Sequence, residues 1–102
     1  MTISYTSTQE MLTAKISGEI DHHGAKSARE EIDRKYKSEN VKNLTLDMSA
    51  ITFCDSSGLG LIMGRYKTVK EYGGELFVQK PANSVKKMIL LSGLDRLVRI
   101  TE

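Results

Sequence analysis

Residues 44–79 read LTLDMSAITFCDSSGLGLIMGRYKTVKEYGGELFVQ, and this stretch decides the fold of the chain. Apolar residues alternate at 44–48 and continue to Cys54, which predicts a buried strand that ends before Asp55. Residue types that favour the start of a helix follow at 55–57, and Gly73-Gly74 is a strong stop signal for that helix. Because a second short apolar strand follows directly, the stretch predicts a βαβ unit with parallel strands and a right-handed crossover.

The same periodicities predict further strands and helices on both sides of this unit. The regions predicted outside it are strands at 3–7 and 12–17, a loop at 18–24, a helix from about residue 25, a helix capped by Asn83 or Ser84 and closed by Gly93, and a strand at 97–101. The resulting order, ββαβαβαβ, is typical of an α/β fold with a mixed, mainly parallel sheet of four to five strands and helices packed on it. We expect residues 1–102 to form a single domain.

Spacing also predicts which side of each helix is buried. In the first two helices we expect apolar faces made of Ala25, Ala28, Ile32 and Tyr36, and of Leu59, Ile62, Tyr66 and Val69. On the outer face of the first helix, acidic residues precede basic ones by four positions in Glu30–Arg34, Glu31–Lys35 and Asp33–Lys37. This order is favourable on an exposed helix face, so the first helix is predicted to have a solvated outer face that includes these three pairs.

The composition excludes several classes of protein. Fifteen Lys and Arg residues against thirteen Asp and Glu residues give a net charge of +2, which argues against direct binding to nucleic acid. The single cysteine excludes an internal disulfide and a multi-cysteine zinc site, and it fits a reducing compartment. The longest strongly apolar run, at 59–64, is too short to span a membrane, and the N-terminus lacks the features of a signal peptide. We therefore expect a cytoplasmic protein without a membrane segment.

The turn at 54–60, CDSSGLG, is the most informative segment for function. A nucleophile elbow needs glycine two positions before and after the serine, but Ser56 has Gly58 after it and Cys54 before it, and neither histidine follows it. The glycines in 58–64 are one residue too far apart for a dinucleotide fingerprint, and no P-loop lysine follows. We therefore expect no catalytic residues, no enzymatic activity and no cofactor.

Two interpretations of Asp55-Ser56-Ser57 remain open from the residues alone. The first is a plain helix cap, because Asp and Ser accept hydrogen bonds from the free N–H groups of a first turn. The second is a site of phosphorylation. A phosphoserine adds about −1.5 to −2 charges, which the positive end of a helix tolerates, so the modification need not unfold the domain.

The remaining reactive side chains have simple structural interpretations. His22 and His23 are adjacent, so they diverge in a helix or strand and make a poor metal site. We expect them in an exposed loop that leads into the first helix, with Asp21 or nearby residues capping that helix. Cys54 is interpreted as a small buried hydrophobic residue. Leu91, like the leucine of the turn, is a candidate anchor for a partner. The densest basic group, interpreted as a solvated face, consists of Lys80, Lys86, Lys87, Arg96 and Arg99.

Five segments, in order and spanning nearly the whole chain, resemble the anti-sigma factor antagonists of the STAS domain family. The turn DSSGLG at 55–60 carries most of this resemblance, and GEIDHH at 18–23 and GRYK at 64–67 make the sporulation branch, the antagonists of the anti-sigma F factor, the nearest match. The other two segments are GGE at 73–75 and LSGL at 91–94.

This resemblance implies a role in partner switching. The unphosphorylated antagonist binds an anti-sigma factor that is also a serine kinase, which releases a sigma factor. The kinase phosphorylates the first serine of the turn, here Ser56, and a PP2C-type phosphatase reverses the reaction. The surface that contacts the kinase is expected to include Asp21, His22, Asp55, Ser57, Gly58, Leu59 and Gly60.

Two departures and two alternatives accompany this interpretation. Family members usually continue after the last strand into another helix, whereas this sequence stops at Glu102, and Cys54 stands where an apolar Met is common. A STAS module of another regulatory system, such as a general stress or transporter system, is one alternative. The other is a small nucleotide-binding domain that uses residues 58–64 and nearby basic residues, although it lacks a general base and metal ligands at credible spacing.

Overall fold

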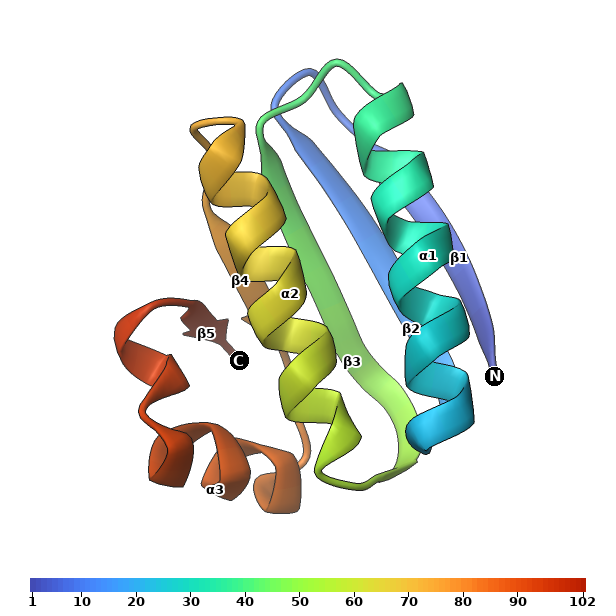
Figure 1. Ribbon diagram of the computed structural model, residues 1–102, viewed down its shortest axis with the longest axis vertical. Helices are drawn as coiled ribbons and strands as arrows, with labels where there is room; N and C mark the ends of the chain where they lie inside the picture. The colour runs from blue at the N-terminus through green and yellow to red at the C-terminus, as the bar shows by residue number, and fades with distance from the viewer.

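Five strands form one sheet, and their order along the sheet, β1-β2-β3-β4-β5, equals their order along the chain. The computed structural model describes all residues 1–102 (Figure 1). Its elements are β1 (Thr2–Ser7), β2 (Met11–Ile20), α1 (His22–Ser38), β3 (Asn43–Cys54), α2 (Ser57–Glu71), β4 (Leu76–Gln79), α3 (Asn83–Ser92), a 3₁₀ turn (Leu94–Arg96) and β5 (Arg99–Thr101). Strand β1 pairs antiparallel with β2, and all other neighbours are parallel. The predicted element order and the mixed, mainly parallel sheet are confirmed.

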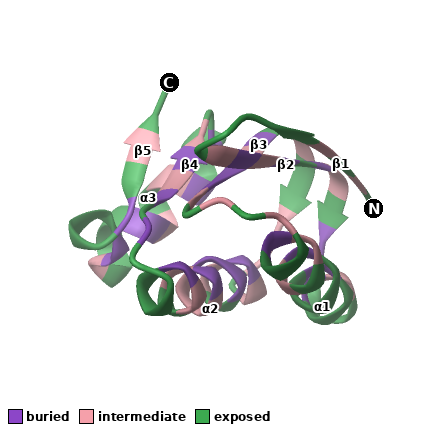
Figure 2. Ribbon diagram, turned by 90° about the horizontal axis from the view of Figure 1, so that it is seen from above, coloured by how far each residue is buried: buried purple, intermediate pink, exposed green.

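The helices pack against one face of the sheet and bury the core between them. Helices α1 and α2 lie side by side in front of the sheet (Figure 1), and the view from above shows buried residues concentrated where helices and strands face each other (Figure 2). The apolar face predicted for α1 is confirmed, because all four of its residues are buried. The largest fully buried side chains of the core include Tyr36, Leu12, Ile16, Ile20, Ile32, Leu44, Leu46, Met48 and Ile62.

Element boundaries differ from the prediction at two helix starts. The expected loop at 18–24 is wrong: β2 continues through Ile20 because it pairs with β3 as far as Cys54, and α1 begins at His22. The capping of α3 by Asn83 or Ser84 is also wrong, since Ala82 takes the capping position and no side chain caps this helix. The last strand is shorter than predicted, because a 3₁₀ turn precedes it.

The buried face of α2 is only partly the predicted one. Ile62 and Val69 are buried, whereas Leu59 and Tyr66 are half-buried and pack at the margin of the core. The face is completed by Gly58, Leu61 and Arg65. The buried face is shifted because α2 is covered on two sides. The sheet covers one side, and α1 covers the side that carries Arg65.

A buried ion pair joins the two helices. Arg65, whose side chain is 3% exposed, places its Nε 2.7 Å from Oδ1 of Asp33 and donates from Nη2 to Oδ2 at 3.2 Å. Its Nη1 donates to the main-chain oxygen of Leu61 at 3.4 Å. None of the three pairs of residues spaced by four positions on α1 forms an ion pair in the structure. Asp33 points instead toward α2. The guanidinium of Arg65 is buried there, and a buried charge is costly unless it has a partner of opposite charge.

Candidate functional site

Two loops meet at the carboxyl edge of the sheet. The last residues of the parallel strands β2 and β3, Ile20 and Cys54, lie opposite each other in register. The N–H of Asp55 donates to the main-chain oxygen of Ile20 at 3.1 Å and ties the second loop to the first. Because each loop leads directly into a helix, Asp21 and Asp55 begin neighbouring turns at the same edge. Two of the segments singled out in the sequence, which lie more than 30 residues apart, thus form one surface.

The first loop is a helix cap. Oδ1 of Asp21 accepts a hydrogen bond from the N–H of Gly24 at 2.7 Å, so the predicted capping by Asp21 is confirmed. His22 and His23 are both exposed, but they lie in the first turn of α1 rather than in a loop. They border different hollows of the surface, in line with the predicted divergence. The structure contains no group of three His, Cys, Asp or Glu side chains that could hold a metal ion.

In the second loop, Asp55 and Ser57 hold the turn. Oδ1 of Asp55 accepts the N–H of Ser57 at 2.9 Å and also accepts the hydroxyl of Ser57. These two hydrogen bonds, and in smaller part the nearby His22, hold the pKa of Asp55 below its ordinary value. The carboxylate is therefore ionised at neutral pH, with one oxygen committed to the first residue of α2.

Ser56 stands apart from this arrangement. It occupies the N-cap position of α2, is exposed, and makes no capping hydrogen bond with its side chain. The two interpretations of the turn thus apply to different residues: Asp55 and Ser57 do the capping, and the hydroxyl of Ser56 is left free. The assignment of Ser56 as the phosphorylated residue stays a prediction.

The glycines and the leucine of the turn have different surroundings. Gly58 is buried against β3, and a Cβ placed on it would lie 2.2 Å from Sγ of Cys54. Leu59 is half-buried and packs at the margin of the core, and Gly60 is exposed with open space around it. Cys54 is half-buried, and burial raises the pKa of its thiol, which suits a packing role and disfavours a thiolate. Leu91 is 88% exposed on α3.

A hollow of about 300 Å³ lies between the first turns of α1 and α2, beside the Ser56 turn. We call it the α1–α2 groove, and its lining residues are His22, Ala25, Lys26, Arg29, Ser57, Gly60 and Leu61. Lys26 and Arg29 were not identified from the sequence. They follow His22 at four and seven positions, which is one helix face, so the spacing becomes a signal once α1 is known to begin at His22.

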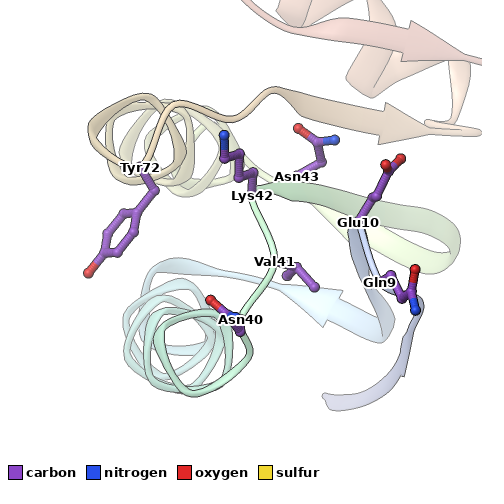
Figure 3. A pocket seen from close by; sticks show the side chains of 7 residues that line it. All are labelled: Gln9, Glu10, Asn40, Val41, Lys42, Asn43 and Tyr72. Atoms are coloured by element: carbon purple, nitrogen blue, oxygen red, sulfur yellow. The ribbon is translucent and has the colours of Figure 1, made fainter.

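The largest hollow, about 620 Å³, lies at the opposite end of the sheet (Figure 3). Two of its polar groups form hydrogen bonds that hold the fold together. Oδ1 of Asn43 accepts the N–H of Glu75 at 3.0 Å, and the main-chain oxygen of Lys42 accepts the hydroxyl of Tyr36 at 2.5 Å. None of its lining residues belongs to the predicted site; they are Gln9, Glu10, Asn40, Val41, Lys42, Asn43 and Tyr72.

The basic group near the C-terminus is a solvated face in which two members have partners. Lys86 pairs with Glu102 at 2.7 Å, and Arg99 pairs with Glu75 at 3.2 Å. Exposed pairs of this kind contribute about 0–1 kcal/mol each.

In the helices of the structure, no apolar stretch is long enough to cross a membrane.

Comparison with known proteins gives consistent matches along the whole chain. The family model described as STAS domain matches residues 2–102. The anti-sigma F factor antagonist of Paenibacillus polymyxa is 34% identical over 90 residues, which are 88% of this chain and 77% of that protein. The structure of the anti-sigma factor antagonist SpoIIAA in its unphosphorylated form has a TM-score of 0.83 at 25% identity and covers 99% of this chain and 89% of its own. The Bacillus cell fate determinant SpoIIAA in its phosphorylated form has a TM-score of 0.77 at 24% identity, over 99% and 92%. These matches confirm the resemblance drawn from the sequence.

Proposed function

Because this chain belongs to the STAS domain family, we propose that it is an anti-sigma factor antagonist that works by partner switching. The unphosphorylated chain binds an anti-sigma factor that is also a serine kinase, and this binding releases a sigma factor for transcription. The kinase phosphorylates Ser56, which ends tight binding, and a PP2C-type phosphatase restores the free hydroxyl. The chain is thus a ligand and a substrate in the cytoplasm rather than an enzyme, and it contacts neither nucleic acid nor membrane directly.

The observation that carries the proposal is the free, exposed hydroxyl of Ser56 at the start of α2. A kinase needs a serine oxygen that can approach the γ-phosphate in line, without first breaking a hydrogen bond inside the substrate. Ser57 is half-buried and donates to Asp55, so its hydroxyl lacks both properties. This difference supports Ser56, and not its neighbour, as the acceptor.

The position of Ser56 also suits a switch that leaves the fold intact. A phosphate there lies at the positive end of α2, where an anion is stabilised by about 0.3–1 kcal/mol. It adds about −1.5 to −2 charges in the middle of the surface formed by Asp21, His22 and the turn. Placed inside an interface, such a charge must be desolvated or paired, and a partner without a matching cation is rejected.

The names of the relatives agree with this proposal. The relative at 34% identity is an anti-sigma F factor antagonist, and SpoIIAA, solved in an unphosphorylated and a phosphorylated form, has the fold of this chain in both. We propose the same pair of states here. The nucleotide-binding alternative has less support, because the glycines at 58–64 match neither a dinucleotide fingerprint nor a P-loop.

The test is phosphorylation with the anti-sigma factor kinase encoded by the same organism. The chain is incubated with this kinase and ATP, and the modified residue is located by mass spectrometry. We expect phosphate on Ser56, no phosphorylation of Ser56→Ala, and unchanged phosphorylation of the control Ser57→Ala. Ser56→Ala should still bind the kinase, whereas Ser56→Asp should bind weakly. A phosphate on Ser57 would overturn the residue assignment, and the absence of any complex with the wild-type chain would overturn the function.

A further inference from the structure

The α1–α2 groove has a basic wall. His22, Lys26 and Arg29 lie on one face of α1 over its first two turns, and all three are exposed side chains that line the groove. No acidic side chain is among the lining residues. With a net charge of only +2 for the whole chain, this is a local concentration of positive charge rather than a general property of the surface.

None of the nearby carboxylates forms an ion pair with Lys26 or Arg29. Asp33 lies four residues after Arg29, where it could pair with it, but both its oxygens face Arg65. Arg29 itself is close enough to Arg65 to help lower the pKa of that side chain, after the larger effect of burial. Neither Lys26 nor Arg29 forms an ion pair, although Glu30 follows Lys26 by four positions. Next to lining residues, the carboxylates of Asp55 and Asp21 accept hydrogen bonds from Ser57 and Gly24, and Asp55 lies near His22.

We propose that the α1–α2 groove is the part of the binding surface that receives an acidic side chain of the anti-sigma factor kinase. This proposal rests on the proposed function and specifies the chemistry of the partner at that site. The groove is continuous with the phosphorylated turn, because Ser57 and Gly60 form its other wall. An Asp or Glu of the partner that enters it would face two unpaired cations and the positive end of α2, and would find no carboxylate that repels it from the lining.

The same groove explains how a phosphate on Ser56 acts on binding. The dianion would stand next to the place where the partner's carboxylate must sit, and the two like charges would compete for the same cations. Binding would then fail by electrostatic exclusion, with no change in the fold of the antagonist. The buried pair of Asp33 and Arg65 joins the two helices that form the walls of the groove.

The test compares two charge reversals on the same helix. Lys26→Glu places a negative charge in the groove, and Lys37→Glu makes the same change of charge on exposed α1 surface outside it. Binding of each unphosphorylated variant to the kinase is measured by calorimetry from about 0.05 to about 0.5 M NaCl, a range that shortens the screening length several-fold. Thermal unfolding of both variants checks that the fold is retained.

We expect Lys26→Glu to weaken binding by about tenfold or more at low salt, and Lys37→Glu to leave it within about twofold. The wild-type affinity should fall as salt rises, and Lys26→Glu should remove much of that dependence. Equal affinities of the two variants, with the wild-type chain bound and phosphorylated, would overturn the groove proposal and leave the function standing. If Lys26→Glu weakens kinase binding by the phosphorylated chain but not by the unphosphorylated chain, the groove binds the phosphate of Ser56 instead, and the proposal is overturned. Failure of the wild-type chain to bind would count against the function itself.

Discussion

Substitution of Gly58 by Ala tests the packing that holds the Ser56 turn on the sheet. An added Cβ would lie 2.2 Å from Sγ of Cys54, whereas ordinary contacts begin near 3.4 Å. To relieve this contact, either Sγ of Cys54 leaves its position near the main-chain oxygen of Asp55, to which it donates at 3.4 Å, or the start of α2 lifts from the strand. Overpacking of this kind costs about 1–3 kcal/mol. Alanine is more favourable than glycine inside a helix by up to about 1 kcal/mol, which offsets part of this cost. The free energy of unfolding should therefore fall by about 1–2 kcal/mol.

A second substitution separates the contact from any other effect of the alanine. In a Cys54→Ala background the sulfur is gone, and Gly58→Ala should then be neutral or stabilising by up to about 1 kcal/mol. The four proteins form a double-mutant cycle whose coupling energy should be about 1–3 kcal/mol. Urea unfolding measures it, and thermal unfolding should show a lowering of Tm of about 4–8 °C per kcal/mol in the single variant. If Gly58→Ala has the same effect with and without the sulfur, the reasoning from this contact is refuted.

Three further predictions concern the ion pair, a buried hydroxyl and the acidic residue of the turn. Arg65→Met should lower the free energy of unfolding by about 3 kcal/mol, because Asp33 keeps a partly buried charge without a partner, and adding Asp33→Leu should restore most of it in urea unfolding. Tyr36→Phe should cost about 1 kcal/mol in the same assay, since the hydroxyl no longer donates to the main-chain oxygen of Lys42; an unchanged midpoint would contradict that hydrogen bond. The folded pKa of Asp55 lies below its ordinary 3.8, so its contribution to stability is present above that pH and is lost as the pH falls through 3.8 toward the folded value. The stability difference between wild type and Asp55→Asn should therefore shrink in acid, and a constant difference down to pH about 2 would contradict the shift.

Local patterns were sufficient to predict the order of elements. The alternation at 44–48 and the glycines at 73–74 and 93 determined where strands and helices occur, and Gly93 closes α3 in the left-handed conformation that glycine favours. The end of β2 was not predictable in this way. Gly18 and Glu19 are poor strand formers, and they stay in the sheet because both pair with β3 in parallel, although the register shifts between them. Pairing between distant segments overrode the local preference.

The site was predictable where one segment carries it and was missed where two helices make it. The turn at 55–60 was singled out from its own residues, and Asp21 was a predicted cap; their place on a kinase-binding surface came from the family resemblance and stays a prediction. Lys26 and Arg29 line a groove only because α2 lies beside α1, and the sequence does not show that Arg65 approaches Asp33 from another helix. Contacts between helices depend on how their faces are rotated toward each other, and a period of 3.6 residues fixes only the faces themselves.

The division of roles between the two serines is what allows a modification to act without loss of structure. Ser57 donates hydrogen bonds from its N–H and its hydroxyl to Asp55. The start of α2 is therefore held by a half-buried serine that is not the proposed site of phosphorylation. Ser56 contributes its main-chain oxygen to the first turn, through Leu59, and keeps its side chain in solvent. A phosphate on that side chain therefore breaks no hydrogen bond of the fold, and its whole effect is on the charge of the surface. The turn keeps the hydroxyl of Ser56 free, and the neighbouring groove contains two cations, Lys26 and Arg29, without ion-pair partners. This arrangement suits electrostatic switching and not switching by unfolding.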